Sequence, residues 1–153
     1  MEIRPFCVLA MLFLATAGLP GAASAAACLL TPEELEAATG REFSAGQEGK
    51  AADGSELCAF AEVAAPTRKL SVNVIASRGK AAYESRLRLL SMGKKDISLK
   101  GAGDAAYFNG TAAGVLSGDK LITLSNLRRA SAPEIPSERI VVLLQAALGR
   151  AGK

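Results

Sequence analysis

The first 27 residues have the three-part pattern of a secretory signal peptide, which limits how much of the chain is left to fold. A basic start at Arg4 is followed by an apolar run over residues 6–17, a break around Pro20 and small residues over 22–27. The apolar run is shorter than the roughly 20 residues that a membrane-spanning helix needs. No second run of that length follows. We therefore expect no transmembrane span in the mature chain, with an uncleaved N-terminal anchor as the alternative.

The small residues at the end of this segment indicate where the signal peptide is cleaved. Ala23-Ser24-Ala25 fits the small-x-small rule for cleavage. We therefore predict a signal peptide over residues 1–25 and a single domain over residues 26–153, exported to the periplasm or secreted. The alternative is a lipid-anchored protein acylated at Cys28. We rank it second because the bacterial lipidation signal has leucine three positions before the cysteine, where this chain has alanine.

Two cysteines, Cys28 and Cys58, remain after cleavage, because Cys7 is lost with the signal peptide. An even number of cysteines in an oxidising compartment is typical of disulfide bonding. We therefore predict a Cys28–Cys58 disulfide, whose loop of about 30 residues would stabilise the fold by roughly 3.7 kcal/mol in the chain-entropy model. A redox pair or a metal site fits less well, because C-x-x-C spacing and further cysteine or histidine ligands are both missing.

Histidine is absent from the whole chain. This removes the most common general base near neutral pH and the most common ligand for zinc, copper and non-haem iron. Three S-x-x-K strings, starting at Ser77, Ser91 and Ser117, lack the companion motifs of serine β-lactamases, and we treat them as chance. We therefore predict a non-enzymatic protein with no metal and no cofactor. An enzyme that uses only carboxylates, lysine and serine is the least favoured alternative.

Charge is unevenly distributed along the chain, although the net charge is only +3. Residues 31–62 hold eight acids and two bases, whereas residues 63–103 hold nine bases and two acids. One interpretation is a basic surface that binds an anionic partner; the other is a solvated surface, or two complementary segments that face each other. We do not expect nucleic acid as the partner. The candidate residues of this basic binding surface are Arg78, Lys80, Arg86, Arg88, Lys94 and Lys95.

Local patterns predict an α+β fold, an antiparallel sheet of about five to seven strands with two or three helices packed on one face. Thr31-Pro32-Glu33-Glu34 predicts a capped helix start, and the alternation over 70–75 predicts a strand with Leu70, Val72 and Val74 on one face. We expect helices over 32–39, 80–92 and about 140–148, the last of which stops near Gly149. We expect strands within 43–63, with a turn at Asp53-Gly54, and then a loop around Pro66. Further strands are expected over 70–75, from 97, and over 105–109, 111–117 and 121–124.

A glycine-rich segment before one of these strands invites a ligand-binding interpretation. Gly101-Ala102-Gly103-Asp104 has part of a phosphate-loop pattern, but a strand rather than a helix follows it. We therefore predict a tight turn in which the Asp104 side chain bonds local backbone N–H groups.

Several short motifs occur together in this chain: Cys28-Leu29-Leu30-Thr31 before a short helix that ends at Thr39-Gly40, Cys58 on a strand, Gly103-Asp104-x-Ala106-Tyr107, the Gly118-Asp119 hairpin and a terminal amphipathic helix. Together they resemble small exported bacterial proteins and lipoproteins of unknown function. The resemblance covers most of residues 28–148, and it implies a disulfide-bonded α+β domain without transferable catalytic residues. The chain departs from that pattern at the leader, which lacks a convincing lipidation signal.

These observations support one leading hypothesis for function and leave two alternatives. We expect an exported, non-enzymatic domain that binds a protein or an anionic component of the cell envelope. The first alternative is an inhibitor of an extracellular hydrolase, such as a lysozyme or a protease, which would present the loop over 101–104 or the loop over 130–136. The second alternative is the membrane-tethered lipoprotein acylated at Cys28.

Overall fold

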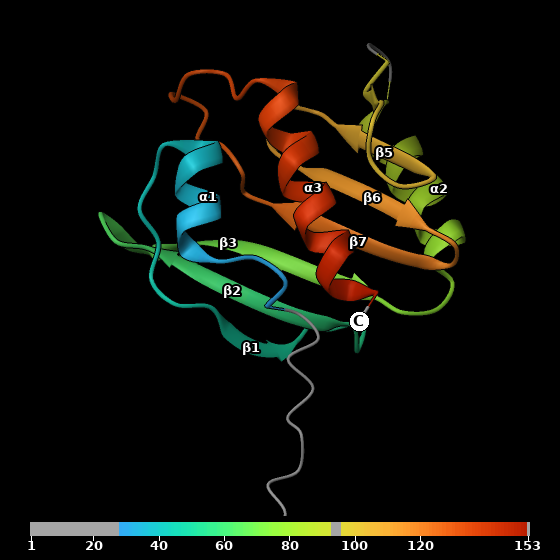
Figure 1. The fold of residues 1–153 in the computed structure, drawn as a ribbon, viewed down its shortest axis with the longest axis horizontal. Coiled ribbons are helices and arrows are strands. Elements are labelled where there is room, and N and C mark those ends of the chain that lie inside the picture. The colour runs from blue at the N-terminus through green and yellow to red at the C-terminus, as the bar shows by residue number, and fades with distance from the viewer. Residues whose placement is uncertain (1–27, 93–95, 153) are drawn as a thin grey trace, which may run out of the picture.

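The computed structural model describes residues 28–92 and 96–152, and it shows an α+β fold with one antiparallel sheet of seven strands (Figure 1). The elements are α1 (Pro32–Thr39), β1 (Gln47–Lys50), β2 (Glu56–Glu62), β3 (Ala65–Ile75), α2 (Gly79–Leu90), β4 (Ser98–Leu99), β5 (Ala105–Phe108), β6 (Ala113–Ser117), β7 (Lys120–Ser125) and α3 (Ser137–Ala151). The strand order is β1-β2-β3-β7-β6-β5-β4. The predicted fold class and strand number are confirmed.

The strands form two meanders that meet in the middle of the sheet. The first three strands are consecutive hairpins, the last four are another such run, and β3 pairs antiparallel with β7. The predicted core face of β3 is confirmed, because Leu70, Val72 and Val74 are all buried. The predicted turn at Asp53-Gly54 is confirmed too, since it separates β1 from β2.

The helices lie on both faces of the sheet, so the expectation of one covered face is wrong. One buried cluster joins α1 and α3 to the face that carries Val72 and Ile122, and a second joins α2 to the face that carries Tyr107 and Leu121. Figure 1 shows α3 in front of the sheet and α2 behind it. Leu121 and Ile122 are adjacent and therefore point to opposite faces of β7, yet both are fully buried. This central strand needs a cover on each side.

Pro66 lies inside β3, so the prediction of a loop around it is wrong. The ladder pairs Glu62 with Ala65 but Ala61 with Lys69, which leaves three β3 residues without an opposite partner. Such a bulge is where a strand tolerates proline, because no ladder bond needs the missing N–H group. The bulge also turns Arg68 out of the ladder, which matters for the pocket described below.

Two further local predictions are corrected by contacts that are distant in sequence. The Asp104 carboxylate accepts a hydrogen bond from the Gly118 N–H at 2.6 Å rather than from its own turn, because the β5–β6 pairing brings the two together. Helix α3 continues through Gly149 to Ala151. Its last turn is held by Arg150, whose guanidinium donates to the Leu29 carbonyl at 2.7 Å.

Cys28 and Cys58 form the predicted disulfide. It ties the segment before α1 to the middle of β2, where Cys58 is fully buried. The cover over this sulfur is tight, since a Cβ atom on Gly46 would lie only 2.5 Å from Cys58 Sγ and 2.8 Å from the Phe60 ring. The disulfide therefore fixes α1 against the sheet at the centre of the core.

Glu34 joins α1 to α3. Arg150 donates to both carboxylate oxygens at 2.7 Å, and the Thr31 N–H donates to one of them at 2.9 Å. The Glu34 N–H in turn donates to the Thr31 hydroxyl. These two bonds between Thr31 and Glu34 form the predicted capping box. The hydrogen bond from Arg150, partly offset by burial, holds the pKa of Glu34 below its ordinary value.

We expect Glu34→Gln to make the free energy of unfolding depend less on pH in the acidic range. Because the pKa of Glu34 is lower in the folded chain, its stabilising contribution is present above the unfolded pKa and lost as pH falls through the folded pKa. The pair is partly exposed, so the contribution at neutral pH should be about 1 kcal/mol or less. Urea unfolding from neutral to acidic pH measures this contribution. Glu36→Gln, on the exposed side of the same helix, is the control, and equal effects of the two substitutions would contradict the assignment.

Candidate anion-binding pocket

The predicted basic surface is centred on α2, and the structure describes four of its six residues. Lys94 and Lys95 lie outside the described residues. Arg78 and Lys80 are exposed at the start of α2, where their backbone N–H groups donate to the Asp119 carboxylate at 2.7 and 3.2 Å.

Arg86 and Arg88 leave α2 in different directions. Two residues along an α-helix correspond to a rotation of about 200°, so the two side chains lie on opposite flanks. Arg86 is half-buried toward the Tyr107 hydroxyl, whereas Arg88 is exposed. Burial raises the pKa of Tyr107, and the nearby Arg86 guanidinium opposes this rise. The structure thus does not bring Arg86 and Arg88 onto one surface.

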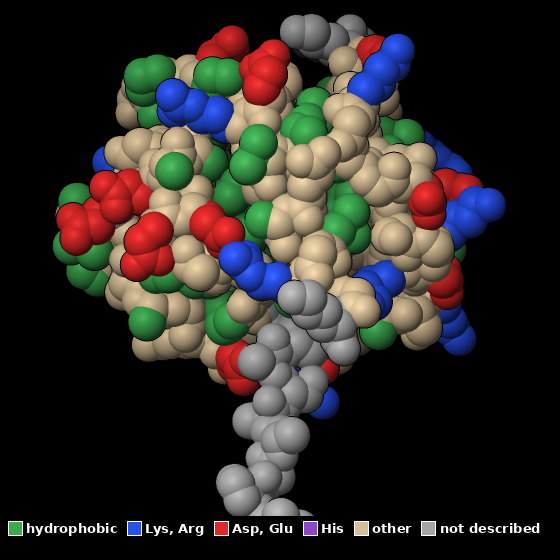
Figure 2. Space-filling view, in the orientation of Figure 1, with side chains coloured by type: hydrophobic (Ala, Val, Ile, Leu, Met, Phe, Trp, Pro, Cys, Tyr) green, Lys and Arg blue, Asp and Glu red, His purple; other side chains and the backbone are tan. Residues whose placement is uncertain are grey.

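A denser group of cations lines a pocket of about 500 Å³ at the end of the sheet where β2 meets β3 and β7 ends. We call it the arginine pocket. Its lining includes Arg41, Phe43, Glu62, Arg68, Arg128 and Arg129. In the face shown in Figure 2, acidic side chains gather over α1 instead, so the uneven charge along the chain becomes an uneven charge in space.

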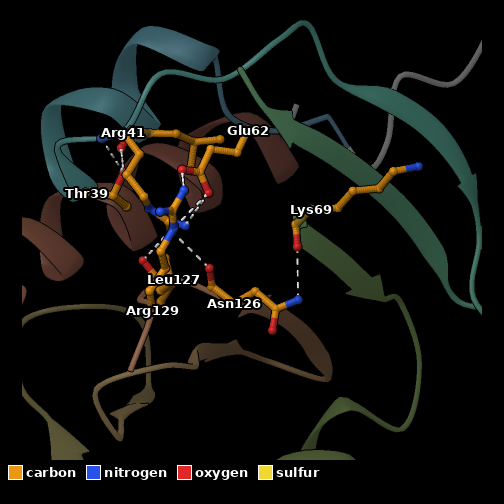
Figure 3. Close-up of polar contacts among 8 residues, drawn as sticks. Thr39, Arg41, Glu62, Lys69, Asn126, Leu127 and Arg129 are labelled. Atoms are coloured by element: carbon orange, nitrogen blue, oxygen red, sulfur yellow. Dashed lines mark hydrogen bonds and ion pairs between the residues drawn. The ribbon is translucent and has the colours of Figure 1, made fainter. Parts of the chain in front are cut away.

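Glu62 is the acid at the base of this pocket, and it is only 3% exposed. Arg41 Nη1 donates to Oε2 at 3.3 Å and Arg129 Nε donates to the same oxygen at 3.3 Å, while Arg129 Nη2 pairs with Oε1. Figure 3 shows both guanidinium groups directed at this one carboxylate. A buried carboxylate needs such partners, because an unpaired charge away from water is very costly.

Arg41 is committed to the fold as well as to Glu62. Its Nη2 donates to the carbonyls of Asn126 and Leu127 at 3.1 and 2.6 Å, and its guanidinium lies 5.2 Å from the centre of the Phe43 ring. Asn126 has a left-handed φ of 63°, which asparagine tolerates better than most residues. Its side-chain amide donates to the Lys69 carbonyl at 2.9 Å, which fixes the end of β7 beside β3.

The pocket carries an excess of positive charge. Burial lowers the pKa of Arg41 first, and the nearby charges of Arg129 and Arg68 lower it further, so the three guanidinium groups repel one another. Arg41, Arg68 and Arg129, set against the single carboxylate of Glu62, leave two positive charges in excess in the pocket. Arg128 lies at the rim, with Glu134 at 3.7 Å. The Lys69 ammonium points away from the cluster in Figure 3, although the residue borders the pocket.

The sequence alone did not predict this cluster, because its members come from four separate segments. Arg41 follows α1, Glu62 ends β2, Arg68 sits in the β3 bulge and Arg129 follows β7. One signal was available, since the alternation of Cys58, Phe60 and Glu62 places a carboxylate on the core face of a predicted strand. A carboxylate at such a position indicates a buried cationic partner.

Within residues 28–92 and 96–152, no group of three or more histidine, cysteine or carboxylate side chains is placed to hold a metal ion. None of the helices in that part of the chain is long and apolar enough to cross a membrane.

Comparisons with protein-family models, with curated proteins and with solved structures found no match to this chain. The resemblance to exported bacterial proteins therefore stays a prediction, and the proposals below rest on the residues themselves.

Proposed function

We propose that the protein is an exported, non-enzymatic domain that binds a protein or a cell-envelope component by an anionic group, which enters the arginine pocket. The observation that carries this proposal is a pocket lined by Arg41, Arg68 and Arg129, whose single buried carboxylate, Glu62, is already paired with two of them. Guanidinium groups stay protonated at physiological pH and pair with carboxylates and phosphates in two-point geometry. The cluster is thus suited to binding an anion.

The same chemistry favours binding over catalysis. A general acid or base must gain and lose a proton near the working pH, which arginine does not do. Glu62, the carboxylate at the base of the pocket, accepts bonds from Arg41 and Arg129 on both oxygens, so it is poorly placed to take a proton from a substrate. Recognition through charge is what these side chains can perform.

The disulfide supports export, because such bonds persist mainly in oxidising compartments. It also favours the free form over the lipidated one. Acylation and the bond to Cys58 would use the same sulfur of Cys28, and that sulfur lies in the disulfide here. A lipid at Cys28 would leave the buried Cys58 thiol without its partner.

The two loops considered for a hydrolase inhibitor differ in the structure. The loop over 101–104 folds back onto α3, with Ala102 buried and the Gln145 side chain donating to the Gly101 carbonyl at 2.7 Å. The loop over 130–136 is largely exposed, is anchored by the buried Ile135 and begins beside the arginine pocket. An inhibitor would therefore present the second loop, and it would do so next to the proposed anion site.

A binding experiment with two charge-matched variants tests the proposal. The oxidised protein is immobilised and challenged with envelope extracts at rising salt. We expect saturable, salt-sensitive retention of a partner, reduced about tenfold by Arg68→Gln with Arg128→Gln, because two pocket cations are lost. The control removes the same charge from the exposed side of α2 by Lys80→Gln with Arg88→Gln. No saturable partner, or equal losses in both variants, would overturn the proposal.

A further inference from the structure

We propose that the arginine pocket selects a compact dianionic oxyanion, with a phosphomonoester as the biological form, over a single carboxylate. This inference rests on the proposed function, because it names the chemical class of the anionic group that the same pocket takes. It is argued from the charge, the available donors and the walls of the pocket.

Charge balance is the first argument. Arg41 and Arg129 both pair with Glu62, and Arg68, which lines the same pocket, is near enough for its charge to act on Arg41. A carboxylate ligand would neutralise one of the two positive charges in excess, whereas a phosphomonoester carries about −1.5 to −2 at neutral pH. Mutual repulsion among the three guanidinium groups is thus relieved most fully by a dianion.

The arrangement of donors is the second argument. Arg41 already donates to Glu62 and to two backbone carbonyls, and Arg129 gives Nε and Nη2 to Glu62. A ligand must therefore be held mainly by the Arg68 fork, with Arg129 Nη1 as a further donor. Among residues 28–92 and 96–152, no acidic side chain lies within ion-pair distance of Arg68. A planar carboxylate is satisfied by one guanidinium fork, whereas a tetrahedral oxyanion has further oxygens that can accept from Arg129 Nη1 as well as from the Arg68 fork.

The walls of the pocket give the third argument. Phe43 lies under the Arg41 guanidinium, and both Phe43 and Leu70 are almost completely buried. These two large apolar side chains therefore offer little surface to the body of a ligand, whereas Arg68, in the β3 bulge, is exposed at the mouth. The pocket is therefore built to hold a charged group whose carrier stays outside.

Titrations with inorganic phosphate, sulfate and acetate at matched ionic strength test this inference. Binding is monitored by the NMR signals of the arginine Nε–H groups. We expect phosphate and sulfate to bind about tenfold more tightly than acetate at pH about 8. Phosphate affinity should fall toward pH about 5.5 as the dianion gains a proton, while sulfate affinity stays constant. Equal affinities for acetate and phosphate at the higher pH would overturn the inference.

Arg68→Gln and Lys69→Gln form the matched pair for this test, because they remove the same charge from neighbouring residues of β3. We expect Arg68→Gln to weaken phosphate binding about tenfold and Lys69→Gln to change it by less than about threefold, since the Lys69 ammonium points away. Equal effects of the two substitutions would mean that phosphate is attracted by the general positive charge of this surface and not by a defined binding site. That result would overturn the inference.

Binding to lipid vesicles distinguishes a lipid headgroup from a soluble phosphorylated ligand as the source of the phosphate group. Phosphatidic acid carries a phosphomonoester, and phosphatidylglycerol carries a singly charged diester. Arg68-dependent binding to the former alone supports a lipid headgroup, whereas binding of inorganic phosphate without either vesicle supports a soluble phosphorylated ligand. If all these probes fail while envelope extracts still yield a partner that needs Arg68 and Arg128, the dianion inference falls and the proposed function stands. If the extracts fail as well, both fall.

Discussion

Replacing Cys28 and Cys58 together by alanine should lower the free energy of unfolding by about 3.7 kcal/mol, because the unfolded chain regains the freedom of a loop of 30 residues. For a domain of this size the midpoint of thermal unfolding should fall by about 10 °C or more. The effect is large because the segment before α1 has few other covalent or ladder constraints. Leu29 and Leu30 are buried there, and without the disulfide only packing and the bond from Arg150 hold them.

Urea unfolding of the oxidised protein, the reduced protein and the double variant measures this effect. Reduction of the wild-type chain should reproduce the stability of the double variant, because both lack the same covalent constraint. Alanine is preferred to serine, since a hydroxyl at Cys58 would be fully buried without a partner. A loss below about 1 kcal/mol in both cases would mean that the disulfide is incidental to the fold, and would weaken the argument for an oxidising compartment.

The parts of the fold that follow from short-range physics could be predicted from the sequence. The capping box of Thr31 and Glu34 and the alternation from Leu70 to Val74 each involve neighbours within a few residues, and each is found as expected. Pro66 shows the limit of such reasoning. Its place in β3 depends on the Glu62–Ala65 pairing that forms the bulge, which a propensity at one position does not encode.

The arginine pocket was hidden for a related reason. Counting charges along the chain assigned Glu62 to an acidic segment and Arg68 to a basic one, yet the bulge places both around one pocket. Arg129 belonged to neither segment. Neither interpretation of the charge pattern describes the ion pairs of Glu62, because Arg41 lies in the same acidic segment and Arg129 lies outside both segments. Such a cluster emerges only when the β2–β3 and β3–β7 pairings are known.

Glu62→Gln is the second substitution for which we expect a large effect. The amide keeps the shape of the carboxylate but leaves Arg41 and Arg129 without their shared counter-charge in a largely buried site. Removing one partner from a buried ion pair typically costs about 3–5 kcal/mol, and the third guanidinium of Arg68 adds repulsion. Glu42→Gln is the control, because Glu42 is exposed and close by in the chain; we expect it to change stability by less than about 0.5 kcal/mol.

Salt dependence separates the structural role of Glu62 from its role in the anion site. In the Glu62→Gln protein the pocket gains one positive charge, so a bound dianion should restore part of the lost stability by linkage. Unfolding at matched ionic strength in sulfate and in chloride measures this recovery, which should be larger in the variant than in the wild type. If sulfate stabilises both proteins equally, the charge of Glu62 does not affect the affinity of the pocket for anions. The carboxylate then serves only to anchor Arg41 and Arg129. A larger recovery in the variant would mean that one carboxylate both holds the end of the sheet together and limits how strongly the pocket attracts anions.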